Sequence, residues 1–135
     1  MGPAVQLARS LHHGGNGMTT RETMQGFFDN VEQRDGWESF LADDIVFTIL
    51  TSPVKRVTGK DACLQATRPF YSTVKSMEVG DLLVDGERAC ALTRYEMQPP
   101  DGSAAFQSDV AEIFSVRDGR IASFSIYFDP SPYPK

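Results

Sequence analysis

The chain has 135 residues and a formal net charge of −5 at pH 7, with 41% hydrophobic and 23% charged residues. That length suits one domain, and the composition of an average globular protein excludes collagen-like and low-complexity chains. The acidic balance, with basic residues scattered rather than striped, argues against nucleic acid and anionic lipid as partners. No run approaches the roughly 18 apolar residues that a membrane span needs, so we expect a cytoplasmic protein.

The N-terminal stretch lacks the pattern of a folded domain. It ends in the glycine-rich run at residues 13–17 and contains no apolar core of a signal peptide. Directly after it, Thr19 and Glu22 have the spacing of a capping box, which starts a helix. We therefore expect an N-terminal extension over residues 1–18 and one domain over residues 19–135.

Helical patterns come first in the domain. From residue 20, apolar residues recur at spacings of three and four until a stop signal at residues 34–36. A short helix should follow around Trp37. A third helical pattern opens at residues 58–61 and reaches Val74, and Pro69 is expected to kink or split it.

Strand patterns fill the rest of the chain. Residues 44–51 are β-branched and aromatic, which predicts a strand, and residues 55–57 offer a short partner. From residue 76 onward, long strand patterns alternate with turn signals at residues 85–86, 99–102 and 118–119. Helices followed by a meander of antiparallel strands indicate the α+β class, with helices on one face of a twisted sheet.

Three short segments carry a family resemblance. They are LADD at residues 41–44, GKDA at residues 59–62, and the final hairpin VRDGRI at residues 116–121 running into YFDP at residues 127–130. Over about residues 19–133 the chain resembles the SnoaL-like branch of the nuclear-transport-factor-2-like superfamily. The resemblance implies a cone-shaped, curved antiparallel β-sheet wrapped around N-terminal helices, a cystatin-like α+β roll. It also implies a cavity inside the cone and a homodimer paired through the open sheet face.

Polyketide cyclases, ketosteroid isomerases and limonene-type epoxide hydrolases share this fold, so function has to be argued from the site. Arg94-Tyr95-Glu96 is similar to the Arg-x-Asp strand motif of the hydrolases, whose charged members point into the cavity. That similarity places Arg94 and Glu96 on the inner face of their strand. The outer face, available for dimerisation, would then carry Ala91, Thr93, Tyr95 and Met97.

Both enzyme types are matched only in part. The second acid of the hydrolases corresponds to Ile126. In the comparison with ketosteroid isomerases, the base position is Ile49, the tyrosine position is Phe27 and the acid position is Glu112. Hydrocarbon side chains thus occupy two of the three isomerase positions, which argues against steroid isomerisation by that mechanism.

Glu112 alternates with Val110 and Phe114, so it should face inward among hydrophobic side chains. A carboxylate in such a place must be paired, or its pKa must rise. Arg94, Glu96 and Glu112 are therefore the candidate catalytic residues for acid-base chemistry such as cyclisation, isomerisation or hydration. In the alternative, Arg94 and Glu96 face solvent or form a structural salt bridge, and the protein is a non-catalytic ligand-binding or dimerisation module.

An aromatic-rich interior suits a small hydrophobic ligand. The candidate pocket residues are Phe27, Trp37, Phe47, Phe70, Tyr71, Phe114, Phe124, Ile126 and Phe128. The two histidines, His12 and His13, fall in the N-terminal stretch, and the acids lack metal-site spacing. No phosphate-binding glycine loop is present, so we expect neither metal nor cofactor.

Overall fold

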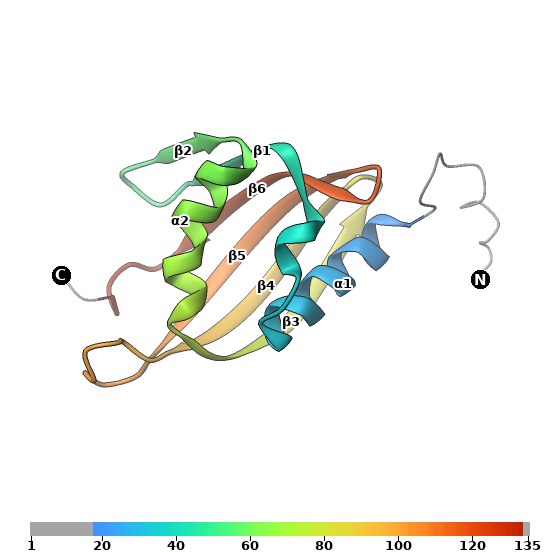
Figure 1. The fold of residues 1–135 in the computed structure, drawn as a ribbon. Coiled ribbons are helices and arrows are strands. Elements are labelled where there is room, and N and C mark those ends of the chain that lie inside the picture. Colours follow the sequence, from blue (N-terminus) through green and yellow to red (C-terminus); the bar gives the residue numbers. More distant parts are fainter. Residues whose placement is uncertain (1–17, 134–135) are drawn as a thin grey trace.

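The computed structural model describes residues 18–133, in which two α-helices and a short 3-10 helix lie on one face of a curved six-stranded sheet (Figure 1). The spatial order of the strands is β2-β1-β6-β5-β4-β3. Their bounds are Leu41–Ile49 (β1), Lys55–Thr58 (β2), Val74–Asp85 (β3), Arg88–Met97 (β4), Phe106–Arg117 (β5) and Arg120–Phe128 (β6). The predicted α+β fold is confirmed. The sheet is mixed, however, because β1 pairs with β6 in parallel.

Helix α1 (Thr20–Gln33) begins and ends where local chemistry predicts. The Thr19 hydroxyl accepts a hydrogen bond from the Glu22 amide at 3.0 Å, and the Glu22 carboxylate accepts one from the Thr19 amide at 2.9 Å. This pair is the predicted capping box. At the other end Arg34 adopts a left-handed conformation with φ of 62°, which stops the helix.

The remaining helical segments follow the sequence patterns, except that Val74, expected at the end of the third helix, begins β3 instead. Residues Trp37–Phe40 form the short 3-10 helix η2, and Lys60–Ser72 form α2. Pro69 lies inside α2 without splitting it, because the helix continues to Ser72. A proline near the end of a helix removes only one backbone donor, so the last turn can still form. The described residues contain no helix long and apolar enough to cross a membrane.

Register shifts interrupt the curved sheet within the β1–β6, β5–β6 and β3–β4 pairs. The pairing of β3 with β4 shifts register between Val74 and Ser76 and again between Val79 and Asp81. Such bulges bend a strand and increase its twist. The sheet thereby becomes concave toward the helices, as expected for the cone. Of the predicted N-terminal extension, residues 1–17 lie outside the described residues.

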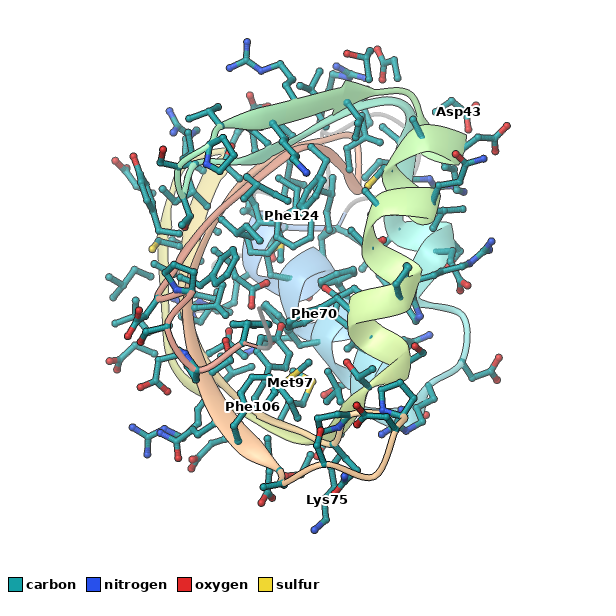
Figure 2. The ribbon with its side chains drawn as sticks, turned by 90° about the vertical axis from the view of Figure 1, so that its left-hand side faces the viewer. Asp43, Phe70, Lys75, Met97, Phe106 and Phe124 are labelled. Atoms are coloured by element: carbon teal, nitrogen blue, oxygen red, sulfur yellow. The ribbon has the colours of Figure 1, made fainter. Side chains whose placement is uncertain are left out.

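The core fills the concave side of the sheet. Phe27 of α1 has no exposed surface and makes edge-on contacts with five other aromatic rings at centroid distances between 5.2 and 6.4 Å. Figure 2 shows Phe70, Phe124 and Met97 in the same interior, between the curved sheet and α2. Aromatic side chains therefore pack the space beneath α1 tightly.

Candidate functional site

A small apolar pocket lies between α2 and the concave face of the sheet. Its volume is about 110 Å³, and it is partly open to solvent. Side chains from α2, β1, β4, β5 and β6 line it, but none from α1 does. Six of the predicted pocket residues contribute to the lining, namely Phe47, Phe70, Tyr71, Phe124, Ile126 and Phe128.

Three predicted pocket residues lie elsewhere. Phe27 and Phe114 have no exposed surface and belong to the packed core, where the Phe114 ring stacks on Phe124 at 4.7 Å. Trp37 lines a different hollow. The pattern of apolar residues correctly places all three inside the fold. This pattern does not distinguish a ring that fills the interior from a ring that borders a cavity, because both kinds of ring are shielded from solvent.

Glu112 is the charged residue of the pocket. It projects inward from β5 with 1% of its surface exposed, as its alternation with Val110 and Phe114 predicted. The Tyr95 hydroxyl donates a hydrogen bond of 2.6 Å to Oε2 of Glu112. The other oxygen, Oε1, is buried and has no hydrogen-bond partner among residues 18–133. The described part of the chain thus leaves one of the two carboxyl oxygens without a hydrogen bond.

Burial determines the protonation of this carboxyl group. Desolvation raises the pKa of Glu112 from 4.5 to about 7, and the hydrogen bond from Tyr95 partly opposes that rise. The Thr93 hydroxyl also lowers the pKa of Glu112, although it does not form a hydrogen bond of ordinary geometry with the carboxyl group. Near neutral pH, Glu112 therefore exists in both its protonated and its ionised form.

Two tyrosines complete the polar end of the pocket. Desolvation, reinforced by the negative charge of Glu112, raises the pKa of both Tyr71 and Tyr95 well above the usual value. Their hydroxyls also interact with each other, and the Phe70 ring packs edge-on against Tyr95 at 5.0 Å. Both hydroxyls consequently stay neutral in the physiological range and can donate hydrogen bonds.

Arg94 and Glu96 do not join Glu112, and the prediction that they face the cavity is wrong. Both are exposed on the convex face of the sheet. The Arg94 guanidinium donates to Asp109 at 3.0 Å, and the Ser76 hydroxyl donates to Glu96 at 3.2 Å. This arrangement corresponds to the alternative in which the two residues face solvent.

The register of the sheet explains the error. Ala91 of β4 lies opposite Glu112 of β5, and directly opposite residues point to the same side of a sheet. The inner row of β4 is therefore Ala91, Thr93, Tyr95 and Met97, all of them buried. This row cannot be the dimer surface that the sequence predicted. Sequence reasoning thereby missed Tyr95, which the more apolar character of its row could have revealed.

A second hollow adjoins the site without containing its chemistry. It measures about 460 Å³, shares Tyr71 with the apolar pocket, and is lined by charged side chains such as Arg34, Arg68 and Lys75. Arg68 is already paired with Glu38 at 3.6 Å. We place the candidate site in the smaller pocket because the buried carboxyl group lies there. No cluster of three or more metal-binding side chains occurs in the described part of the chain.

Comparison with known proteins identifies the family. Among solved structures, a protein from Kribbella flavida has 25% identity and a TM-score of 0.68, with 82% of this chain and 87% of that chain covered. A presumed isomerase from Bacillus subtilis has 19% identity and a TM-score of 0.71, with 83% and 87% covered. A presumed SnoaL-like polyketide cyclase from Mesorhizobium loti has 22% identity and a TM-score of 0.62, with 82% and 99% covered. No curated protein matches the sequence. Residues 13–124 match the SnoaL-like domain, and this chain therefore belongs to the SnoaL-like domain family.

Proposed function

We propose that this protein binds a small hydrophobic molecule in the pocket beside α2 and performs acid-base chemistry on it through Glu112. The observation that carries the proposal is the unpartnered Oε1 of a buried carboxyl group that borders an apolar pocket. Leaving such a group unsatisfied costs about 1–3 kcal/mol. A ligand that supplies a hydrogen-bonding oxygen or an acidic C–H group at Oε1 would remove that cost.

The pKa of Glu112 suits proton transfer. A general acid or base works best when its pKa lies near the operating pH, and burial brings this carboxyl group to about 7. The ionised form would remove a proton from a carbon next to a ligand carbonyl. The protonated form would return that proton at a second carbon, so the double bond moves and the enzyme is regenerated without a co-reactant.

The tyrosines support the same chemistry. A proton leaves a carbon next to a carbonyl more easily when the carbonyl oxygen accepts a hydrogen bond as its negative charge develops. Tyr71 lines the pocket and keeps its proton at neutral pH, so its hydroxyl would turn from Tyr95 toward that oxygen. The proposed reactions are therefore isomerisation and cyclisation. The presumed isomerase and cyclase among the structural neighbours agree with this reaction class.

Isomerisation of 3-cyclohexen-1-one to 2-cyclohexen-1-one tests the proposal, because the conjugated product absorbs in the ultraviolet. We expect turnover by the wild-type protein and loss of about 10²-fold or more in Glu112→Gln, the range typical of a general base. Glu96→Gln is the matched control, since its carboxylate is exposed on the opposite face, and it should retain full activity. Equal rates for the wild-type protein and Glu112→Gln would exclude Glu112 as the base.

One observation favours a second candidate, a ligand-binding module without catalysis. Tyr95 already occupies Oε2 of Glu112, so the carboxyl group is satisfied in part by the protein itself. Binding of cyclohexanone without exchange of its α-protons for deuterium in D₂O, followed by NMR, would support this candidate. Exchange that depends on Glu112 would support the enzyme.

A further inference from the structure

The last described residue, Tyr133, forms part of the pocket wall although it lies beyond the end of the sheet. Its hydroxyl shares a hydrogen bond of 2.6 Å with that of Ser108, which is itself 1% exposed. The Tyr133 ring also packs edge-on against Phe106 at 5.0 Å and Phe128 at 5.1 Å. Tyr133 is therefore docked into the sheet by one polar and two aromatic contacts.

A compact turn holds Tyr133 in this position. The Asp129 carboxylate accepts hydrogen bonds from the amide and the hydroxyl of Ser131, at 3.0 and 2.9 Å. The Tyr133 amide donates to the Pro130 carbonyl at 3.0 Å. Two prolines within the segment, Pro130 and Pro132, further restrict its backbone. Figure 1 shows the chain leaving β6 behind α2 and turning downward over these residues.

Tyr133 and Glu112 line the same pocket from different positions along the sheet. Ser108, which anchors Tyr133, and Glu112 both point inward from β5 and are four residues apart, about 13 Å along a strand at roughly 3.3 Å per residue. Phe128 pairs with Val110 between them and lines the same pocket. Hydrocarbon side chains such as Val110 and Phe128 line the pocket between these two positions.

We propose that Tyr133 sets the length limit of the pocket and restricts it to ligands with a single six-membered ring that carries one hydrogen-bonding oxygen. The volume agrees, because the pocket holds about 110 Å³ and an engineered cavity of about 150 Å³ binds one benzene molecule. This inference rests on the proposed function for the position of the ligand oxygen at Glu112. It adds a ligand class and a residue that determines specificity.

Calorimetric titration with phenol and 2-naphthol tests the inference. The wild-type protein should bind phenol about tenfold or more tightly than 2-naphthol, since an oversized group in a packed site carries a penalty of this order. Tyr133→Ala should gain about tenfold in affinity for 2-naphthol with little change for phenol. Tyr127→Ala, which removes an exposed tyrosine of β6, should keep the wild-type preference.

Ser108→Ala and Tyr133→Phe each remove the hydrogen bond between the two hydroxyls but keep the Tyr133 ring, so each should shift the preference in the direction of Tyr133→Ala by a smaller amount. Circular dichroism of each variant establishes that the fold is intact. The inference is overturned if neither Tyr133→Ala nor Ser108→Ala changes the ratio of the two affinities, or if the wild-type protein binds 2-naphthol as tightly as phenol. With that ratio unchanged and the isomerisation of 3-cyclohexen-1-one still lost in Glu112→Gln, the proposed function stands and only the role of Tyr133 fails. If the wild-type protein binds neither probe, both proposals fail.

Discussion

Replacing Glu112 by Gln should remove a large pH dependence from the stability of this protein. Burial raises the pKa of Glu112 in the folded state from 4.5 to about 7. Between these values the folded state binds more protons than the unfolded state, so the free energy of unfolding falls as the pH rises. A carboxyl group with a raised pKa therefore contributes its full stability below about pH 4.5 and loses it as the pH passes about 7.

The size of the effect follows from the same shift. Each pKa unit corresponds to about 1.4 kcal/mol, so the rise from 4.5 to about 7 amounts to about 3 kcal/mol. Gln has nearly the shape of the protonated acid and does not ionise. We expect Glu112→Gln to match the wild-type protein near pH 4.5 and to be about 2–3 kcal/mol more stable at about pH 8.

Urea unfolding of the two proteins across this pH range, followed by fluorescence, is the assay. Trp37 is the only tryptophan and is buried, so its emission reports unfolding. The difference between the two proteins isolates Glu112, because other titrating groups cancel. Glu96→Gln removes an exposed carboxylate and should reproduce the wild-type profile. A difference between the wild-type protein and Glu112→Gln that stays constant from pH 5 to pH 8 would refute the reasoning.

Three further predictions concern other parts of the molecule. Tyr95→Phe removes the hydrogen bond that stabilises ionised Glu112, so the midpoint of the pH profile should move upward in the same urea experiment. A midpoint that is unchanged or lower would contradict the assigned contact between Tyr95 and Glu112. Phe27→Ala should lower the free energy of unfolding by about 3–5 kcal/mol, because five aromatic rings surround Phe27. Chemical denaturation measures this loss, and a loss below about 1 kcal/mol would mean that the core repacks easily. We expect a homodimer that uses the convex face of the sheet, where Leu92 and Tyr127 are exposed. Leu92→Arg should therefore convert the dimer to a monomer in sedimentation velocity. A wild-type protein that is already monomeric would contradict this expectation.

Much of the fold can be predicted because its signals are local. Thr19 and Glu22 cap α1 from a distance of three residues, so the start of the helix is visible in the sequence. Gly119 adopts a φ of 73° in the last hairpin, a conformation that glycine favours, and the turn signal at residues 118–119 marks it. The inward position of Glu112 follows in the same way from the alternation of its neighbours on β5.

The composition of the site depends on contacts between distant parts of the chain. Alternation divides β4 into two rows and does not say which row faces the helices. The pairing of Ala91 with Glu112 decides it, and Tyr95 rather than Arg94 then reaches the carboxyl group. A three-residue motif was too weak a guide, because Arg94 and Tyr95 differ by a single step along the strand and hence by a complete change of face.

The sequence by itself thus determined the order of helices and strands, the α+β class and the inward-facing Glu112, since each depends on neighbours within a few residues, whereas the curved cone was implied by the family resemblance. Only the tertiary structure decided that Tyr95 contacts Glu112, that Phe27 and Phe114 fill the interior whereas Phe70 borders a cavity, and that Tyr133 lines the same cavity. These features depend on strand register, on the volume left after side chains pack, and on the path of the chain after β6. None of the three is encoded by local periodicity.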